Sequence, residues 1–552
     1  MIPTKESLTT EFKSDRGPLS DRDLIETVVC LANSEGGVIY LGVEDDGRVT
    51  GVHTNHRDYQ GLAALISNRT TPSVHVRVNS LFPDGETLVL HIEVPKMTQI
   101  VATNDGVIKR RRMQADGTPS CVPFLPHEFN SRLTNFRKMD ISALPVPEAT
   151  PDDLDPIQRA LLRQFIERNS GDDVLLELDD TRFDSALGLI VREEDVWRPT
   201  LTGLLLIGRE SSLRRLVPTH EIAFQMLEGE EVRLNEFTRA PLIQALEWLE
   251  TLFKPLNPET EMQLGLFRVS VPRLDWRAFR EALANAVIHR DYSKIGAVHV
   301  RIEGDVLTIS NPGGLVEGVT LNNLLTTEPR PRNPSLADAC KRIGLVERTG
   351  RGVDIIYRGL LRYGKSRPDY SRTDRHTVVL RLSLSEANLA FLNLVLKEEE
   401  RTGKPLPIES LITLSLLQEQ KRLTRNELAS FIQKDSADAG RTLEALVEAG
   451  LVQPHGATRG RTYTLSPQVY KELGATVEYT RQAGFARLQQ EQLVCNYVRQ
   501  TGSIRRSEVM DLCRLDGMQA YRLLRRLIDK GVLEKRGEKR WAYYIPGPTF
   551  KE

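Results

Sequence analysis

Apolar side chains recur every three or four positions over residues 20–34, and two glycines separate this stretch from a β-branched run at 38–43. This spacing is typical of a helix with one face on a core, and a short apolar run bounded by glycine is typical of a buried strand. Two further strand-like runs follow at 74–78 and 87–94. The pattern predicts an α+β domain over residues 1–135.

The middle of the chain alternates helical and extended patterns. A stretch rich in proline and aspartate, residues 144–156, is typical of a linker. Residues 276–287 have helical periodicity, and β-branched runs beyond them predict strands. These runs lie at 298–303, 306–310 and 377–384. We therefore expect a second domain over residues 140–385 and, after it, two mostly helical units that resemble each other, at 405–470 and 485–547.

Composition places the chain among ordinary globular proteins, since 40% of its 552 residues are hydrophobic and 27% are charged. That length exceeds a single hydrophobic core, so we expect an α+β multidomain protein. The formal net charge is −1. Any binding to phosphate must therefore come from local clusters of Lys and Arg, because the molecule has no global positive field.

The five cysteines are widely spaced and form no C-x-x-C pair. They are Cys30, Cys121, Cys340, Cys495 and Cys513. Their spacing fits neither a zinc site nor a disulfide framework, and it predicts reduced thiols in an intracellular protein. The polar first 13 residues lack the apolar core of a signal peptide, and the most apolar stretch, 201–208, is too short to span a bilayer. We expect a cytoplasmic protein with no membrane partner.

Each of the two C-terminal units contains an amphipathic helix that stops at a glycine, Gly450 or Gly531. The preceding helix begins at a Ser or Thr cap, Thr424 or Ser507, and a basic turn with an aromatic strand follows. This order resembles the winged-helix family, in which a helix enters the major groove of DNA and the basic hairpin contacts phosphate. The resemblance implies DNA contacts from Arg441, Arg459 and Arg461 in the first unit and from Arg522, Arg525, Lys535, Arg536 and Lys539 in the second. Winged helices also serve as dimerisation or docking modules, so both uses stay open.

Three motifs near the N-terminus occur in order, at residues 5–13, 31–37 and 41–47. Together they are similar to the Schlafen core, also called the Alba-like DNA-binding domain, over about residues 5–130. In animal Schlafen proteins this core can be a metal-dependent RNA endonuclease. The resemblance implies catalytic and metal-binding roles for Glu6, Glu11 and Asp45, with Lys13 beside them. Clustered carboxylates would hold Mg²⁺ or Mn²⁺, and Lys13 would neutralise developing charge.

The same residues also have a purely structural interpretation. Glu11 and Lys13 would form an ion pair on a strand surface, and residues 45–47 would make a hairpin turn. A basic run follows in the same domain, Lys109, Arg110, Arg111 and Arg112. This run would grip a sugar-phosphate backbone, or else form a solvated edge strand.

Three motifs mark the central domain, at residues 280–292, 309–315 and 349–356. In the first, Glu281, Asn285 and His289 are spaced four apart and so share one helix face. The set resembles the ATPase fold shared by gyrase, sensor histidine kinases and mismatch-repair MutL, within the RecG-related ATP-binding subgroup. The resemblance covers about residues 140–385.

That resemblance implies ATP and Mg²⁺ as cofactors. Glu281 would position or activate water, and Asn285 would hold magnesium. The other implied contacts are Asn311, Gly313 and Gly314 around adenine and Gly350 and Gly352 at the phosphates. The aspartate that normally reads adenine is replaced by Asn311, so hydrolysis of the nucleotide stays open. In the alternative interpretation, these polar residues only pack a helix on a sheet and the glycines form a turn.

Residues 359–366 formally fit the P-loop pattern G-x-x-x-x-G-K-[ST]. The first glycine lies in a helical segment, no apolar strand precedes it, and Arg367 and Pro368 follow where a helix would begin. We therefore predict a helix end at Gly364 and no P-loop.

These features favour a nucleotide-responsive nucleic-acid-binding protein, an ATP-binding regulator of transcription that binds DNA. One alternative is a Schlafen-type metal-dependent endonuclease that cleaves tRNA or other RNA in phage defence or stress. The other is a protein-binding scaffold. The sequence leaves open whether the chain forms a homo-oligomer.

Overall fold

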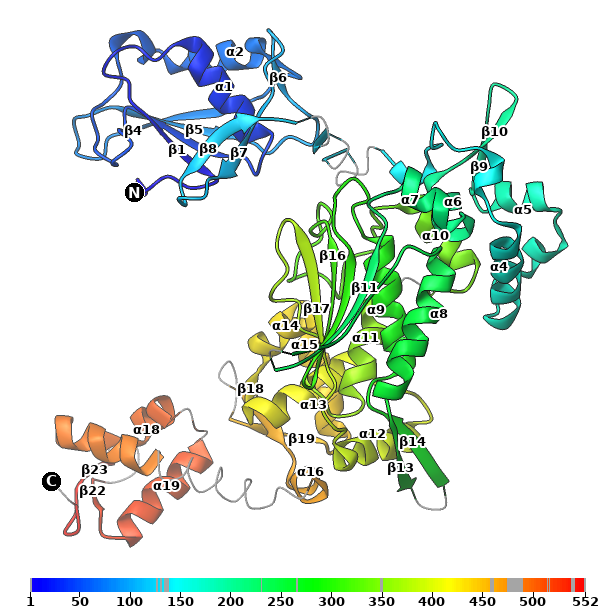
Figure 1. Ribbon diagram of the computed structural model, residues 1–552. Coiled ribbons are helices and arrows are strands. Elements are labelled where there is room, and N and C mark those ends of the chain that lie inside the picture. Colours follow the sequence, from blue (N-terminus) through cyan, green and yellow to red (C-terminus); the bar gives the residue numbers. More distant parts are fainter. Residues whose placement is uncertain are drawn as a thin grey trace. The chain divides into compact units, whose positions relative to one another are not determined.

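The computed structural model describes residues 2–125, 128–129, 132–133, 139–229, 231–264, 267–347, 351–456, 461–473, 490–513, 515, 517–537 and 542–550. The chain divides into two compact units, residues 1–141 and 142–552. Both combine helices with several sheets (Figure 1), which confirms the α+β multidomain fold class. Among the described residues, every helix is too short or too polar to cross a membrane.

The N-terminal unit is built on a four-stranded sheet with the order β1-β2-β5-β4. The strands are β1 (Thr10–Lys13), β2 (Gly37–Leu41), β4 (Arg77–Leu81) and β5 (Val89–Val94). β1 runs parallel to β2, and the other neighbours pair antiparallel. Glu11 therefore lies on an edge strand, beside Ile39 of β2.

Two helices, α1 (Asp21–Ala32) and α2 (Tyr59–Arg69), contribute to the core of this unit. α1 begins where the Ser20 side chain accepts a hydrogen bond from the Asp23 N–H at 3.1 Å, as an N-cap does. Its apolar face is buried, as the periodicity predicted. The expected strand at 74–78 begins only at Arg77.

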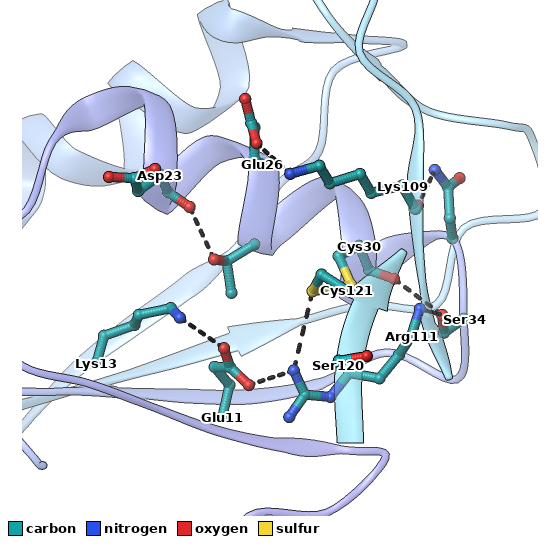
Figure 2. The surroundings of a disulfide bond; sticks show 12 residues. Glu11, Lys13, Asp23, Glu26, Cys30, Ser34, Lys109, Arg111, Ser120 and Cys121 are labelled. Atoms are coloured by element: carbon teal, nitrogen blue, oxygen red, sulfur yellow. Dashed lines mark hydrogen bonds and ion pairs between the residues drawn. A yellow bond between two sulfur atoms is a disulfide. The ribbon is translucent and has the colours of Figure 1, made fainter. Parts of the chain in front are cut away.

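Two short strand pairs complete the unit. They are β3 (Thr70–Thr71) with β6 (Ala102–Thr103), and β7 (Lys109–Met113) with β8 (Pro119–Pro123). α1 packs against the β7–β8 hairpin, and Cys30 of α1 forms a disulfide with Cys121 of β8 (Figure 2). The prediction that all cysteines are reduced thiols is therefore wrong for this pair. The sequence hides the bond because 91 positions separate the two residues, whereas folding brings their Cα atoms to 5.9 Å.

Residues 144–156 are not the linker that their composition predicted. The Val146 N–H donates to the Pro199 carbonyl at 2.9 Å, and buried Asp153 accepts from the Ser212 hydroxyl at 2.7 Å. The prolines and aspartates of this stretch form the turn η3 (Pro151–Asp153) and cap α4 (Pro156–Arg168). Turn-forming residues thus attach this stretch to the second unit.

The central part of the second unit has a five-stranded sheet with the order β12-β11-β15-β16-β17. Its strands are β11 (Ile222–Glu228), β12 (Glu231–Thr238), β15 (Val298–Glu303), β16 (Val306–Pro312) and β17 (Thr377–Ser383). Helix α9 (Trp276–Ile288) packs on β16, and α11 (Gly352–Leu361) packs on α9 (Figure 1). The predicted helix and three strands of this region agree with these elements.

Smaller elements surround this sheet. The helices are α5 (Asp180–Ala186), α6 (Leu201–Ile207), α7 (Glu210–Leu216), α8 (Leu242–Phe253) and α10 (Pro334–Arg342). The strands form two hairpins, β9 (Ile190–Glu193) with β10 (Val196–Pro199), and β13 (Glu259–Leu264) with β14 (Phe267–Pro272).

The first C-terminal unit follows helix α12 (Leu389–Thr402). It contains α13 (Ile408–Gln420), α14 (Arg425–Ile432), α15 (Ser436–Glu448), α16 (Pro467–Glu472) and a sheet of β18 (Leu423–Thr424), β20 (Thr462–Leu465) and β19 (Val452–His455). Thr424 caps α14 in a capping box with Glu427, as expected. Leu361 of α11 belongs to the same hydrophobic core, so this unit is continuous with the central domain.

The second C-terminal unit repeats this element order. A helical segment at 490–501 precedes β21 (Ile504–Arg505), α18 (Arg506–Cys513), α19 (Gly517–Asp529), β22 (Leu533–Arg536) and β23 (Tyr543–Pro546). The helix predicted to start at a Ser507 cap begins at Arg506 instead, and the Glu508 carboxylate accepts from the Arg505 N–H at 2.6 Å. In both units the amphipathic helix is followed by a glycine with positive φ, +75° at Gly450 and +70° at Gly531.

Candidate nucleotide site and nucleic-acid interface

A cavity of about 670 Å³ lies between α9, α10, the start of α11 and the strands β16 and β17. Part of its wall comes from the segment 315–330, here called the cavity loop, which contributes Leu315, Val316, Val319 and residues 324–330. Such a cavity is large enough for a small-molecule ligand.

Glu281, Asn285 and His289 all line this cavity, as their spacing of four on α9 predicted. Glu281 is only 6% exposed, and burial raises the pKa of its carboxyl to about 7, although a backbone hydrogen bond from Glu347 opposes the shift. Burial lowers the pKa of His289 to about 4, so its imidazole is neutral near pH 7. The cavity therefore holds a carboxyl poised near neutrality beside an uncharged amide and imidazole.

Helix α11 begins at the cavity with Gly352. A Cβ atom at Gly352 would lie 2.1 Å from Glu281 Oε1, so only glycine lets the helix start approach this carboxyl. The first N–H groups of a helix have no partner within the helix and carry partial positive charge, which favours phosphate. Gly350, the other glycine predicted at the phosphates, lies outside the described residues.

Asn311 and Gly314, which were predicted to lie around the adenine, also line the cavity. Asn311 is buried, and a Cβ at Gly314 would lie 2.7 Å from the Asp374 carbonyl oxygen. Gly313 was predicted to contact the base but is not part of the lining. Its φ is +103°, and a Cβ there would lie 2.8 Å from the Cβ of Asp291, so this glycine serves local packing.

Sequence reasoning missed three basic residues that line the cavity, Arg330, Lys341 and Arg351. They come from the cavity loop, from α10 and from the residue before α11. No spacing rule connects them, because they are brought together only by the tertiary fold. These cations are groups that bind phosphate in proteins, and the cavity lining also includes the acidic residues Glu328, Asp338, Glu347 and Asp354.

The P-loop-like stretch does not form a phosphate site. Gly359 lies inside α11, and the Lys365 ammonium is buried and donates to the Arg273 carbonyl. Gly364 has a φ of +66° just beyond the helix, which agrees with the predicted helix end.

In the N-terminal unit, the structure brings Glu6 and Glu11 together but not Asp45. Burial raises the pKa of Glu6, and the neighbouring Glu11 carboxylate adds to the shift. Glu6 accepts a hydrogen bond from the Phe12 N–H at 2.8 Å. Asp45 is exposed in the tight turn between residues 44 and 48. Within the described part of the chain, no three His, Cys, Asp or Glu side chains are grouped as a metal site requires.

Glu11 is instead held by two cations, as Figure 2 shows. Lys13 Nζ lies 2.7 Å from one carboxylate oxygen, and the Arg111 guanidinium pairs with the other. The Arg111 side chain is 1% exposed, and it also donates to the carbonyls of Ser7 and Thr10, both at 3.1 Å. Glu11 and Lys13 thus form the ion pair of the structural interpretation, with Arg111 as an additional partner.

The basic run on β7 is mostly used within the domain. Lys109 pairs with Glu26 at 2.5 Å, and Arg110 Nε donates to Glu128 at 2.8 Å. The prediction that the whole run grips a nucleic-acid backbone is wrong for Arg111, because its side chain is buried on Glu11. Arg112 is exposed.

Basic side chains of the first C-terminal unit also have local partners. Arg441 pairs with Asp438 three residues earlier, and Arg461 stacks on the Tyr463 ring at 5.3 Å from its centroid. Arg459 lies outside the described residues. Among the described residues of this unit, Arg441 and Arg461 thus have partners within the unit itself.

The second C-terminal unit differs. Arg522 and Arg525, three positions apart on α19, are exposed, and neither forms an ion pair within the part of the chain that the structure describes. Tyr521, next to them, is 42% exposed. Lys535 and Arg536 on β22 are exposed as well, although Arg536 lies 3.1 Å from Glu534. Lys539 lies outside the described residues. Within the described residues, α19 thus presents two cations that form no ion pair, and β22 presents Lys535.

Three protein-family models match parts of the chain. The Schlafen, AlbA_2 family model matches residues 6–117. The N-terminal domain is a Schlafen AlbA_2 domain. The family HATPase_c_4, described by its relation to the C-terminal part of the ATP-dependent DNA helicase recG, matches residues 296–380, and a domain of unknown function matches residues 131–223. The suspected combination of a Schlafen-type and a RecG-related ATPase-type domain is thereby confirmed.

One solved structure with a similar fold is that of the DIP2311 protein from Corynebacterium diphtheriae. It is 24% identical, the match covers 84% of this chain and 93% of that chain, and the TM-score is 0.51. This similarity establishes a shared fold. Together, the Schlafen AlbA_2 and ATPase-type domains indicate nucleic-acid binding and nucleotide binding, the latter usually with Mg²⁺.

Proposed function

We propose that this protein binds ATP with Mg²⁺ in the central cavity and that the nucleotide controls its binding to DNA, as in a regulator of transcription. The observation that carries this proposal is the arrangement around α9. Glu281 and Asn285 lie on the cavity wall beside Gly352 at the start of α11. Asn285 would supply an amide oxygen to Mg²⁺, and Glu281 would position water when ionised.

Nucleic-acid binding is assigned to the second C-terminal unit. Arg522 and Arg525 leave α19 on one exposed face, with Tyr521 beside them. A recognition helix and a basic hairpin are the two contact surfaces of a winged helix on DNA. The Arg441–Asp438 ion pair of the first unit argues against an equal role there.

The test is fluorescence anisotropy of a labelled DNA duplex titrated with the full chain at low salt, with and without magnesium-ATP. We expect the dissociation constant to change by about fivefold or more when the nucleotide is present, since allosteric couplings usually have at least this size. An unchanged dissociation constant under saturating nucleotide would contradict the proposed regulation.

The ribonuclease alternative rests on the closeness of Glu6 and Glu11. Its weakness is that Arg111 and Lys13 already neutralise Glu11. Incubation of the purified protein with tRNA and Mn²⁺ separates the two functions. Cleavage that is lost in Glu11→Ala would favour the enzyme, and DNA binding without cleavage would favour the regulator.

A further inference from the structure

Gln433, in the turn between α14 and α15, contacts the cavity loop directly. Its amide nitrogen donates to the Leu321 carbonyl at 2.7 Å, and its amide oxygen accepts from the Leu325 N–H at 2.7 Å. One side chain of the first C-terminal unit thus satisfies a backbone acceptor and a backbone donor of the loop. The Leu325 side chain packs against the hydrophobic core of that unit, which reinforces the same contact.

The cavity loop is itself tied together around Asn323. The Asn323 side chain accepts from the Thr320 N–H at 2.7 Å and donates to the Gly318 carbonyl at 3.0 Å. The backbone carbonyl of Asn323 accepts a hydrogen bond from the Thr327 N–H at 2.8 Å. A constraint at Leu321 and Leu325 therefore acts on the turn from Gly318 to Thr327, which includes the cavity-lining residues Val319 and 324–327.

The first C-terminal unit also contacts α11, which begins at the cavity with Gly352. Arg358 of α11 donates to the Leu406 carbonyl at 2.6 Å, and Tyr357 packs against the core of the unit. The unit thus contacts the cavity wall at two places, the loop and the helix.

We infer that Gln433 is a positioning residue of the nucleotide site, which holds the cavity loop in the geometry that lines the cavity. The inference rests on the proposed nucleotide function and adds its regulation. Nucleotide binding would tighten the Gln433 contact, and the contact would strengthen nucleotide binding by the same factor, because linkage is reciprocal. The α14–α15 turn would thereby report whether the cavity is occupied.

The backbone at Gln433 suggests the variant to use. Its φ is +57°, a left-handed conformation that Asn and Gly accept more readily than other residues. Gln433→Asn keeps the amide and the backbone preference but shortens the side chain by one methylene, so the amide cannot reach the loop. Gln433→Gly removes the side chain without adding strain. Gln420→Asn, at the exposed end of α13, is the matched control.

The experiment is calorimetric titration of the four full-length proteins with magnesium-ATP, together with hydrogen exchange at the Leu325 amide. Both Gln433 variants should bind magnesium-ATP about tenfold more weakly than the parent, the effect expected when two hydrogen bonds that order a loop are lost. Gln420→Asn should match the parent. Magnesium-ATP should slow Leu325 exchange in the parent and leave it fast in Gln433→Asn.

Two outcomes would overturn the inference in distinguishable ways. Parent-like affinity in Gln433→Asn, with the same nucleotide effect on Leu325 exchange, removes the role of Gln433 and leaves the nucleotide site intact. Absence of magnesium-ATP binding in the parent removes the proposed nucleotide function and the inference with it.

Discussion

At the residue scale, Glu281 is a cavity-lining carboxyl whose pKa is raised by burial to about 7. The carboxyl shares its helix face with Asn285 and His289, it is only 6% exposed, and Gly352 lies close to it. Desolvation penalises the ionised form, so the proton stays on to a higher pH than in water. A carboxyl that titrates near neutrality is typical of functional sites.

The raised pKa of Glu281 predicts a pH dependence of stability. The Glu281 carboxyl has a pKa of 4.5 in the unfolded state, so the folded state binds its proton more tightly. This group therefore lowers the free energy of unfolding as the pH rises from 4.5 to about 7. Above about pH 7 it adds no further change. Glu281→Gln should abolish this loss, which amounts to about 3 kcal/mol. Urea unfolding of both proteins between about pH 5 and about pH 8 measures it. Parallel pH profiles would contradict the assignment.

The Arg111–Glu11 pair makes a second prediction at this scale. Arg111→Met leaves Glu11 buried with only Lys13 as a partner, and should lower the free energy of unfolding by about 3 kcal/mol. The neighbouring Arg112→Met is the control, since its exposed side chain should cost no more than about 0.5 kcal/mol. Thermal or urea unfolding would compare the two variants. Equal effects would show that Arg111 is not structural.

At the scale of elements, the β7–β8 hairpin is the least expected part of the N-terminal domain. Its basic residues looked like a surface for nucleic acid, yet the hairpin packs on α1 through the Lys109–Glu26 ion pair and the Cys30–Cys121 bond (Figure 2). The hairpin therefore contributes to the stability of the domain as well as to its charge.

Removing the disulfide tests this role. Cys30→Ala combined with Cys121→Ala should lower the free energy of unfolding of the N-terminal unit by about 2–4 kcal/mol, because the bond closes a long loop. In a strong reducing agent the parent should become as labile as the variant. If the parent and the variant unfold together under oxidising conditions, the bond contributes nothing.

Local patterns in the sequence predicted the elements well where periodicity was strong. α1, α9 and strands β15 to β17 were expected within a few residues, because each buries a regular apolar face. The strand expected at 74 starts later because the Val74 N–H is bonded to the Thr70 hydroxyl at 2.9 Å instead of entering the sheet. Apolar character alone did not distinguish a buried residue outside the sheet, such as Val74, from a residue of the strand.

The candidate site was predicted only in part, because local spacing identifies residues of one helix and does not identify residues that meet only in the folded domain. The α9 residues share a helix and could be found by spacing, whereas Arg330, Lys341 and Arg351 meet only in the folded domain. Gln433 is more than one hundred positions from the loop that it contacts. Long-range contacts of this kind leave no local signature in one sequence.

At the scale of the whole molecule, a net charge of −1 conceals an uneven distribution of unpaired cations. In the first C-terminal unit Arg441 is neutralised by Asp438, whereas α19 of the second unit leaves Arg522 and Arg525 unpaired within the described residues. Two modules with the same element order therefore differ in what they can bind.

This asymmetry predicts different effects of equivalent substitutions. The double variant Arg522→Ala with Arg525→Ala should weaken binding to duplex DNA. The slope of log K against log salt concentration should become shallower by the amount expected for about two phosphate contacts. Arg441→Ala should change both quantities little, since its charge is already paired. Anisotropy titrations at several salt concentrations provide the comparison. A larger effect of Arg441→Ala would reverse the assignment of the two units.

The central claim is that the cavity between α9 and α11 binds a magnesium-nucleotide through Asn285. Calorimetric titration of magnesium-ATP into the full chain and into Asn285→Ala tests it most directly. We predict saturable binding by the parent and weaker binding, by about tenfold or more, in the variant, because the amide ligand to Mg²⁺ is lost. Equal affinity in the two proteins, or no binding by the parent, would contradict the account.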